Sequence, residues 1–421
     1  MDPAKPSLDL LRALSDERVL RALMREPRLT RAELAAVAGL SKPTAGESVR
    51  RLVAAGLVAD TGARTAGGRG RGRVGSYYAL AGDVGLALAV SIAPGGIVAE
   101  CVNAHGAVVS RAERAITRPA RPAQAAAALH AAASQAVAAA APKIPRTPEA
   151  PEVPEAPEVP KSPVVPAAPA APAGAADRSG GPVGLAVVSA ADPVDRASGR
   201  MVHLPDSPFL LGDLDPAGVL APLVAGPVTV DNDVNWAARA ERAAAADGGV
   251  ALDDFAYVYL GEGLGCAVVS DGEVRRGHSG LAGEIAHLLT VGPGGRAASL
   301  IEVFGDLGLR QPGATAIDPA RLLSAVTEAP ATREVVARAV AGAIAAIVAL
   351  ADPAQIVLGG PWGRHPVVAN AVTAAVSDLP RPVPVRPACL TTEPSLTGAR
   401  ATALARLQSA IVARAHPTPP P

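Results

Sequence analysis

The sequence is poor in aromatic residues and in cysteine, and both shortages narrow the structures and sites that it can form. Phe, Trp and Tyr make up only 2% of its 421 residues, so its cores must be built mainly from Leu, Val and Ala. Its three cysteines, at positions 101, 266 and 389, lie far apart and form no Cys-x-x-Cys pair. This pattern argues against a disulfide framework and against a cysteine zinc site.

A secretion signal and long apolar runs are lacking as well. The first residues, MDPAKPSLDLL, do not show the charged and then apolar layout of a signal peptide. By inspection, no apolar run reaches the length needed to cross a bilayer. The sequence therefore predicts a cytoplasmic protein that has no membrane partner.

Charge of either sign is balanced over the whole chain but not along it. Residues 1–80 hold 14 Lys and Arg against 8 Asp and Glu, whereas the remaining residues hold 25 against 31. The length also exceeds what one ordinary core accommodates, so at least two domains are expected. A small basic domain on a larger acidic one is typical of a nucleic-acid reader.

Residues 1–80 carry the pattern of a winged helix-turn-helix domain. Helices are predicted over 8–25, over 30–38 behind a capping box, and over 41–55 behind the N-cap Ser41, with Val49, Leu52 and Val53 facing inward. Short strands are predicted over 57–60 and 77–80, on either side of a Gly/Arg-rich loop. The tight turn at Gly39 and the strand pair complete the motif.

The third helix and the loop of the wing supply the candidate DNA contacts. The helix begins SKPTAGES, a short, polar and basic first turn of the kind that enters a major groove. The loop GGRGRGR, over 67–73, is a slim cationic strip that suits an A·T-rich minor groove. The predicted contact residues are Ser41, Lys42, Pro43, Thr44, Glu47, Ser48, Arg50 and Arg51 on the helix, the last two with phosphates, and Arg69, Arg71 and Arg73 in the wing.

The rest of the chain reads as one α/β domain, interrupted by a segment of low complexity. A hairpin is predicted over 84–112, with its turn at 103–106, and a helix over 121–141; residues 183–408 then alternate strands and helices. Residues 143–180 repeat Pro-Glu-Ala/Val-Pro, which predicts an exposed, disordered spacer. Residues 409–421 are predicted to be a Pro-rich tail.

Three segments of this large domain resemble motifs of the ROK family (repressors, open reading frames and kinases). PVTVDNDVNWAA at 227–238 is similar to its strand, Asn-Asp and helix segment. LGEGLGCAVVSDG at 260–272 resembles its second phosphate loop, and GHSGLAGEIAH at 277–287 its sugar-binding signature. The resemblance covers 84–408 apart from the insert, and IVLGG at 356–360, SKPT and GGRGR agree with it. It implies an α/β, two-lobed sugar-kinase fold, actin-like or ribonuclease-H-like, behind the winged helix-turn-helix domain.

The resemblance also implies the candidate effector residues. Asn232, Glu284 and His287 match sugar contacts of the family, Glu302 matches another more loosely, and Asp233 stands where a kinase has its general base. Each has a simpler reading on its own, since Asn232 and Asp233 suit a helix cap and His287 suits a hydrogen-bonded core. Their joint occurrence within the motifs favours a ligand site.

The sequence departs from the family at the positions that hold a nucleotide and zinc. SIAPGG at 91–96 lacks the Asp, Thr and Lys of the family's first phosphate loop, and Pro94 removes a backbone donor. Glu262 places a carboxylate in the second loop, where a triphosphate carries its negative charge. Two unit charges 4 Å apart repel by about 4 kcal/mol at an effective dielectric of ~20, so we expect weak ATP binding unless a metal or a lysine compensates. The zinc cluster is replaced by VGPGGRAASL at 291–300, so we predict neither metal nor cofactor.

The sequence accordingly predicts a DNA-binding transcriptional regulator, a repressor that is released by a sugar or sugar derivative, and not an enzyme. It is expected to bind a double-stranded operator as a homodimer or a tetramer. Two alternatives stay open. One is a regulator whose large domain only dimerises or binds a protein; the more distant one is an ATP-dependent sugar kinase with Asp233 as its base.

Overall fold

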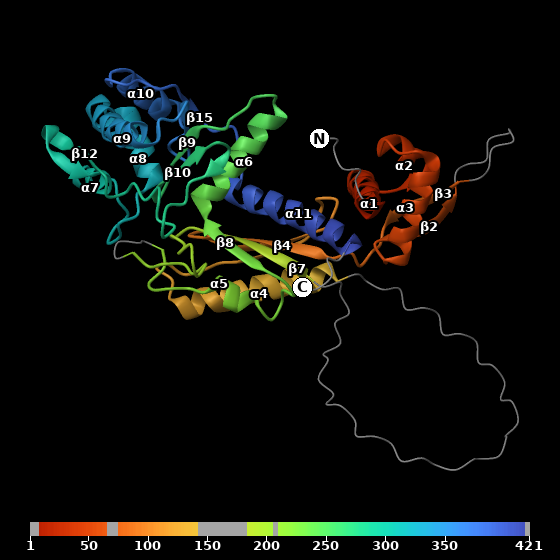
Figure 1. The fold of residues 1–421 in the computed structure, drawn as a ribbon. Helices are drawn as coiled ribbons and strands as arrows, with labels where there is room; N and C mark the ends of the chain where they lie inside the picture. Colours follow the sequence, from red (N-terminus) through yellow and green to blue (C-terminus); the bar gives the residue numbers. More distant parts are fainter. Residues whose placement is uncertain (1–7, 65–74, 142–182, 205–208, 417–421) are drawn as a thin grey trace, which may run out of the picture.

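The winged helix-turn-helix domain forms as the local signals predict (Figure 1). This computed structural model describes residues 8–64, 75–141, 183–204 and 209–416. The domain contains α1 (Leu8–Arg25), β1 (Leu29–Thr30), α2 (Arg31–Val37), α3 (Lys42–Ala54), β2 (Val58–Arg64) and β3 (Ser76–Leu80). The strands pair in the order β1-β3-β2.

Both predicted caps of this domain are confirmed. Thr30 and Glu33 form a reciprocal capping box on α2, and the hydroxyl of Ser41 accepts from the backbone amide of Thr44 at the start of α3. Val49 and Leu52 are buried as expected, but Val53 is 42% exposed. That prediction was wrong because Val53 lies beside the core-facing stripe of α3 rather than within it.

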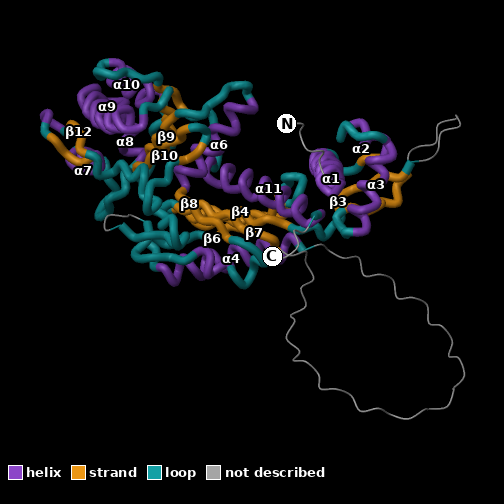
Figure 2. The backbone as a smooth tube through the Cα atoms, viewed as in Figure 1, coloured by secondary structure: helices purple, strands orange, loops and turns teal. Residues whose placement is uncertain are grey.

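The N-terminal lobe of the large domain is a five-stranded sheet in the order β6-β5-β4-β7-β8. Its strands are β4 (Leu86–Ala93), β5 (Gly96–Val102), β6 (Val108–Arg114), β7 (Val183–Ala190) and β8 (Val228–Asn232). Figure 2 shows α4 (Pro122–Ala140) on one side of the sheet and α11 (Pro394–Ala415) on the other. A short helix, α5 (Pro216–Leu220), packs beside α4.

The segment over 84–112 contains one strand more than we expected. The predicted turn at 103–106 is confirmed between β5 and β6, but a second turn at Pro94 and Gly95 divides the apolar run before it into β4 and β5. Proline and glycine end the pairing there because they favour a turn over an extended strand. The predicted helix over 121–141 is α4, whereas the predicted spacer over 143–180 lies outside the described residues.

The C-terminal lobe is built on a second five-stranded sheet, in the order β11-β10-β9-β14-β15. The helix α6 (Asp233–Asp247) follows the last strand of the first lobe directly and contacts β9 and β10. The remaining elements of this sheet and its cover are β9 (Phe255–Leu260), β10 (Leu264–Ser270), β11 (Glu273–Val274), β12 (Leu289–Val291), the 3-10 turn η1 (Pro293–Gly295), β13 (Ala297–Ser299), α7 (Leu300–Asp306), α8 (Pro319–Glu328), α9 (Pro330–Ala351), β14 (Gln355–Gly359), α10 (Pro366–Ser377) and β15 (Val385–Pro387). The predicted two-lobed α/β fold is confirmed.

One helix of this lobe corrects our expectation about apolar runs. By length and composition alone, α9 is long and apolar enough to span a membrane, with a mean hydropathy of 2.0 over its best window. Half of that window is buried, and residues such as Val340, Ile344 and Ile347 belong to the core of the lobe. Its apolar character is accounted for by packing against α8, α10 and β12.

The last helix corrects the predicted tail and joins the two domains. We expected a tail from residue 409, but α11 continues to Ala415 and only residues 417–421 lie outside the described part. Leu407 and Ile411 are buried in the same apolar cluster as Leu20 and Leu23 of α1. The helix continues because these apolar side chains have a partner surface on the winged helix-turn-helix domain, which the sequence pattern does not reveal.

Candidate functional site

The largest candidate site is a cavity of about 380 Å³ between the two lobes. Its walls come from the β4–β5 turn, the segment after β7, the start of α6, the β9–β10 turn and the loop before β12. Four of the five predicted effector residues line it: Asn232, Asp233, Glu284 and His287. The sequence motifs therefore converge on one concave site, as a small-molecule pocket requires.

Asn232 has a structural role and also faces the cavity. It is the N-cap of α6, and its Oδ1 accepts from the backbone amide of Val234 at 2.9 Å. Its Nδ2 lies 3.4 Å from the carbonyl oxygen of Asp192 and 3.5 Å from that of Ala190. The side chain thus ties the start of α6 to the segment that follows β7, and so fixes two walls of the cavity.

Four carboxylates line this pocket, those of Asp192, Asp233, Glu262 and Glu284. Burial, reinforced by the charges of Glu284 and Asp192, raises the pKa of Asp233 to about 7. Burial and the charge of Asp192 likewise raise the pKa of Glu284 to about 7, although this side chain is open to solvent within the cavity. Near neutral pH the group therefore holds both ionised and protonated carboxyls, which can accept from and donate to the hydroxyls of a ligand.

We expect these carboxylates to make the protein less stable as the pH rises. Asp233 binds a proton in the folded chain up to about pH 7, but in the unfolded chain only up to about pH 4, so the stabilisation is complete below about 4 and lost through about 7. Asp233→Asn should remove the share of this dependence that Asp233 contributes, leaving that of Glu284, and raise the stability at pH 8 by about 1 kcal/mol, or ~2–4 °C in Tm. Thermal unfolding between pH 5.5 and 8 measures both.

The exposed Asp378 at the end of α10 offers a matched control. Asp378→Asn removes a carboxylate of the same type and should leave the pH profile of the wild type unchanged. An Asp233→Asn variant whose profile equals that of the wild type would show that Asp233 titrates as an ordinary carboxyl.

Glu302 is not among the residues that line the cavity, so the geometry does not support its predicted role as an effector contact. It is an exposed residue at the third position of α7, where its carboxylate accepts from the backbone amide of Ser299 at 3.1 Å and from its hydroxyl at 2.8 Å. These hydrogen bonds lower the pKa of Glu302. The carboxylate is held as half of a capping box, a local arrangement that the loose match to the family motif concealed.

Glu262 lies in the β9–β10 turn and has a partner that the sequence did not reveal. Arg118, which precedes α4 in the other lobe, donates a hydrogen bond to its carboxylate across the cleft. We expected a lysine or a metal to be needed to balance this charge, and an arginine 144 positions away supplies the balance instead. The ion pair thus occupies the position of the second phosphate loop.

The sequence interpretation also missed Asp192 as a cavity residue. Asp192 stands two positions after the last residue of β7, and β7 runs parallel to both β4 and β8. Polar residues just beyond the carboxyl ends of parallel strands commonly line a ligand crevice, so this position was a usable signal.

Within the described residues, His, Cys, Asp and Glu nowhere form a group of three that could hold a metal ion.

The tip of α3 presents most of the predicted DNA contacts to solvent. Ser41, Lys42, Pro43, Glu47 and Arg50 are exposed. Thr44 is half-buried, and its hydroxyl lies 2.8 Å from that of Ser41. Arg50 pairs with Glu47 one turn earlier, at 2.9 Å, an exposed pair of small energetic worth that a phosphate can replace. Arg69, Arg71 and Arg73 lie outside the described residues.

Ser48 and Arg51 are turned toward the interior of the reading domain. Ser48 is fully buried and donates to the carboxylate of Asp16 on α1, so the prediction that it reaches base edges was wrong. Arg51 donates to the same carboxylate at 2.6 and 3.1 Å, and His416 Nε2 at the end of α11 lies 3.2 Å from it. Asp16, which is 2% exposed, therefore links α1, α3 and α11.

Comparison with known proteins agrees with this two-part organisation. A model of the ROK family matches residues 173–405, and a model described as winged helix-turn-helix DNA-binding matches residues 12–59. A bifunctional enzyme NanE/NanK from Brucella melitensis is 34% identical over 144 residues, which is 32% of this chain and 27% of that enzyme. The chain thus spans only about a quarter of the length of this curated relative.

Solved structures share the fold at low sequence identity. A ROK family transcriptional regulator, described as a homologue of the E. coli MLC protein, has a TM-score of 0.58 at 17% identity, covering 96% of this chain and 99% of that one. A ROK hexokinase from Thermus thermophilus has a TM-score of 0.51 at 20% identity, covering 77% of this chain and 99% of that one. The first similarity takes in both the small domain and the lobes.

Proposed function

Because this chain belongs to the ROK family and begins with a winged helix-turn-helix domain, we propose that it is a DNA-binding transcriptional regulator, a repressor released by a sugar or sugar derivative. The observation that carries the proposal is the shared core: α11 buries apolar residues against the sheet of the N-terminal lobe and against α1 of the reading domain. A single packed element therefore connects the lobes to the DNA-reading head.

The effector is proposed to act through the angle between the lobes. The cavity lies between them, and α6 carries Asn232 and Asp233 at its start while packing along α11. A Cβ added at Gly398 on α11 would lie 2.0 Å from the carbonyl oxygen of Trp236 on α6, so the two helices touch with no slack. Movement of α6 on ligand binding is then passed to α11 and to α1, with a coupling of typically 1–3 kcal/mol.

We propose that the same cleft does not transfer phosphate. The β4–β5 turn carries Pro94 where a phosphate loop presents backbone donors, and the ion pair of Arg118 and Glu262 stands in the second loop. Asp233 retains the position and the raised pKa of a general base, but a base needs a bound phosphoryl donor. ATP-dependent phosphorylation of a hexose by the purified protein would reverse this part of the proposal.

On DNA, we propose a homodimer in the cytoplasm that reads a pseudo-palindromic operator. The exposed tip of α3 enters the major groove, and the wing arginines, predicted from the sequence alone, enter an A·T-rich minor groove. Half-sites should lie about 34 Å apart or at a multiple of that spacing. Fragments retained from genomic DNA test the operator, and sedimentation of the protein tests the dimer.

We predict that Asp233→Asn weakens the binding of the sugar effector by roughly 10- to 150-fold. A sugar hydroxyl that donates to an ionised carboxylate contributes about 1.5–3 kcal/mol, and the amide that replaces it is a weaker acceptor. In the wild type, affinity should rise from pH 6 to pH 8 as Asp233 and Glu284 ionise. A panel of sugars is screened by thermal shift, and the sugars that bind are then titrated against operator complexes.

Two results would count against this effector site. If Asp233→Asn and the exposed control Asp378→Asn bind the sugar equally well, the sugar occupies another place. If no sugar or related metabolite stabilises the protein or moves its DNA-binding curve, the large domain is a dimerisation body or a docking surface for a protein. DNA binding itself would survive both results.

A further inference from the structure

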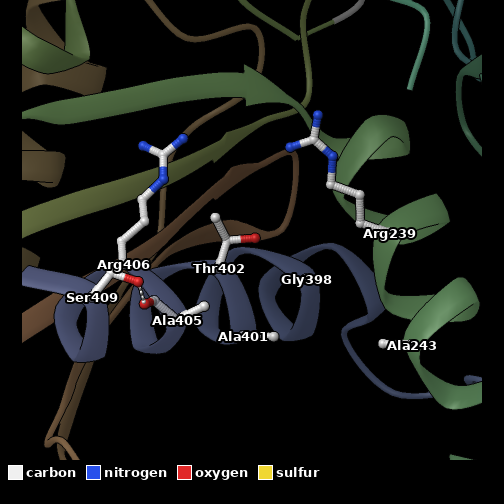
Figure 3. A pocket seen from close by; sticks show the side chains of 8 residues that line it. All are labelled: Arg239, Ala243, Gly398, Ala401, Thr402, Ala405, Arg406 and Ser409. Carbon is white, nitrogen blue, oxygen red and sulfur yellow. Dashed lines mark hydrogen bonds between the residues drawn. The ribbon is translucent and has the colours of Figure 1, made fainter. Parts of the chain in front are cut away.

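A groove between α6 and α11 carries two arginines that the effector pocket does not use. Arg239 on α6 and Arg406 on α11 line one cavity of about 340 Å³. Figure 3 shows both side chains extending to the same side of α11, with Thr402 between them. The residues that line this groove and those that line the pocket between the lobes do not overlap.

Small residues make room for this groove. Gly398 brings the two helices into contact beside Trp236, and away from that point the facing surfaces carry Ala243, Ala401 and Ala405. Methyl groups leave an open floor where longer side chains would fill the space between helices. The walls of the groove are then set by the two arginines and by the hydroxyls of Thr402 and Ser409.

Positive charge exceeds negative charge around the groove. Asp231, which is 3% exposed, lies 3.7 Å from Arg239 Nη2 and 3.1 Å from Arg276 Nε, so one carboxylate serves two guanidinium groups. Asp231 also accepts from Asn235 at 2.9 Å. Burial, together with the charges of Arg276 and Arg406, lowers the pKa of Arg239 despite the carboxylates of Asp231 and Glu273. An added anion would relieve this repulsion.

Arg239 also has unused donors. Its guanidinium stacks over the ring of the buried Trp236 at 4.7 Å, which fixes the plane of the group, and within the described residues it donates no hydrogen bond. Arg406 donates to the hydroxyl of Thr229, a neutral partner that an anion can displace. The hydroxyl of Ser409 donates to the carbonyl oxygen of Ala405 at 2.9 Å, so the donors open to a ligand are the two guanidinium groups and the hydroxyl of Thr402. These groups match the oxygens of a phosphate, which accepts several charge-assisted hydrogen bonds at once.

We propose that the groove between α6 and α11 binds a phosphate group, supplied either by inorganic phosphate or by a phosphate monoester of a small metabolite. Bound there, the group joins Arg239 of α6 to Arg406 of α11 and so clamps α6 onto the helix that connects the lobes to the winged helix-turn-helix domain. This site is separate from the proposed sugar pocket and does not depend on it.

The test is calorimetric titration of the full chain with sodium phosphate, in chloride buffer at constant ionic strength. Titration with glucose 6-phosphate, and with glucose as the neutral control, then separates a monoester from the free ion. Arg406→Gln should weaken binding at least tenfold, since it removes a charge-assisted interaction. The control is Arg338→Gln, which removes an equal charge from an exposed ion pair on α9, a helix that does not line the groove. It should leave phosphate binding unchanged.

Four results decide the matter. Tenfold weakening in Arg406→Gln, with Arg338→Gln and Asp233→Asn as wild type, supports the site and keeps it distinct from the sugar pocket. Absence of binding for both phosphate probes at millimolar concentration overturns it, as does equal binding by Arg406→Gln and wild type. If Arg406→Gln instead weakens only DNA binding, the groove belongs to the DNA-contacting surface and the proposal is wrong. Should Arg406→Gln fail to fold, Arg239→Lys is titrated in its place, because it keeps the positive charge and removes only the guanidinium fork.

Discussion

Replacing Lys42 and Arg50 together by alanine should reduce operator affinity by roughly 30- to 700-fold for each protomer that contacts the DNA. Both residues are exposed on α3, Lys42 in its first turn and Arg50 two turns later. Each lost contact to a base edge or a phosphate costs about 1–2 kcal/mol, and each lost phosphate contact also lowers the slope of log affinity against log salt by about 1 per protomer. Titrations of labelled operator at several salt concentrations measure both quantities.

A matched control separates a contact effect from a change in total charge. The double variant Arg338→Ala and Arg381→Ala removes two exposed cations from the C-terminal lobe, each paired with a carboxylate on the surface. Its operator affinity should stay within a fewfold of the wild type. Should the two double variants lose the same amount, binding would reflect overall charge, and α3 would not be the reading helix.

Asp16→Ala should destabilise the winged helix-turn-helix domain, and its packing on α11, more than the substitution of an exposed residue does. The variant leaves the buried hydroxyl of Ser48 without its acceptor and Arg51 without its carboxylate, both beneath the reading helix. Removing one partner from a buried ion pair costs 3–5 kcal/mol, which we reduce to about 2–4 kcal/mol because Arg51 is partly exposed. For a domain of this size the loss lowers Tm by ~10 °C or more.

The exposed Asp9 on the same helix provides the comparison. Its ion pair with Arg12 is open to solvent, so Asp9→Ala should change Tm by no more than about 2–4 °C. Operator binding measured below the transition should be lost or weakened in Asp16→Ala alone. Equal Tm values for the two variants would mean that the link between α1, α3 and α11 contributes nothing to the placement of the reading helix.

Asp16 also bears on how an effector signal arrives at DNA. Its carboxylate accepts from two residues of α3, while His416 at the end of α11 lies beside it. A shift of α11 therefore reaches the base of the reading helix through one buried carboxylate and the apolar contacts around Ile411. The small domain is held on the large one by this junction, and not only by the chain that connects them.

Local signals in the sequence were enough to locate the reading domain and the start of α6. The caps at Thr30, Ser41 and Asn232 act over two or three residues, so the side chain and the amide that it accepts from are adjacent in the sequence. The family motifs likewise placed Asn232, Asp233, Glu284 and His287 at one cavity. By contrast, Glu302 was predicted as a ligand contact from a loose match to the family motif, and its carboxylate is held in a capping box.

Pairs formed by distant segments were decided by the tertiary structure alone. Glu262 and Arg118 lie 144 positions apart, and Ser48 and Asp16 lie 32 apart, so neither partner marks the other in the sequence. Helix periodicity gives the spacing of the faces of α3 but not which element covers each one, and that choice turned Ser48 inward. The continuation of α11 past residue 409 depends in the same way on a surface of the winged helix-turn-helix domain. The last turns of the helix are stable there because their apolar side chains are buried.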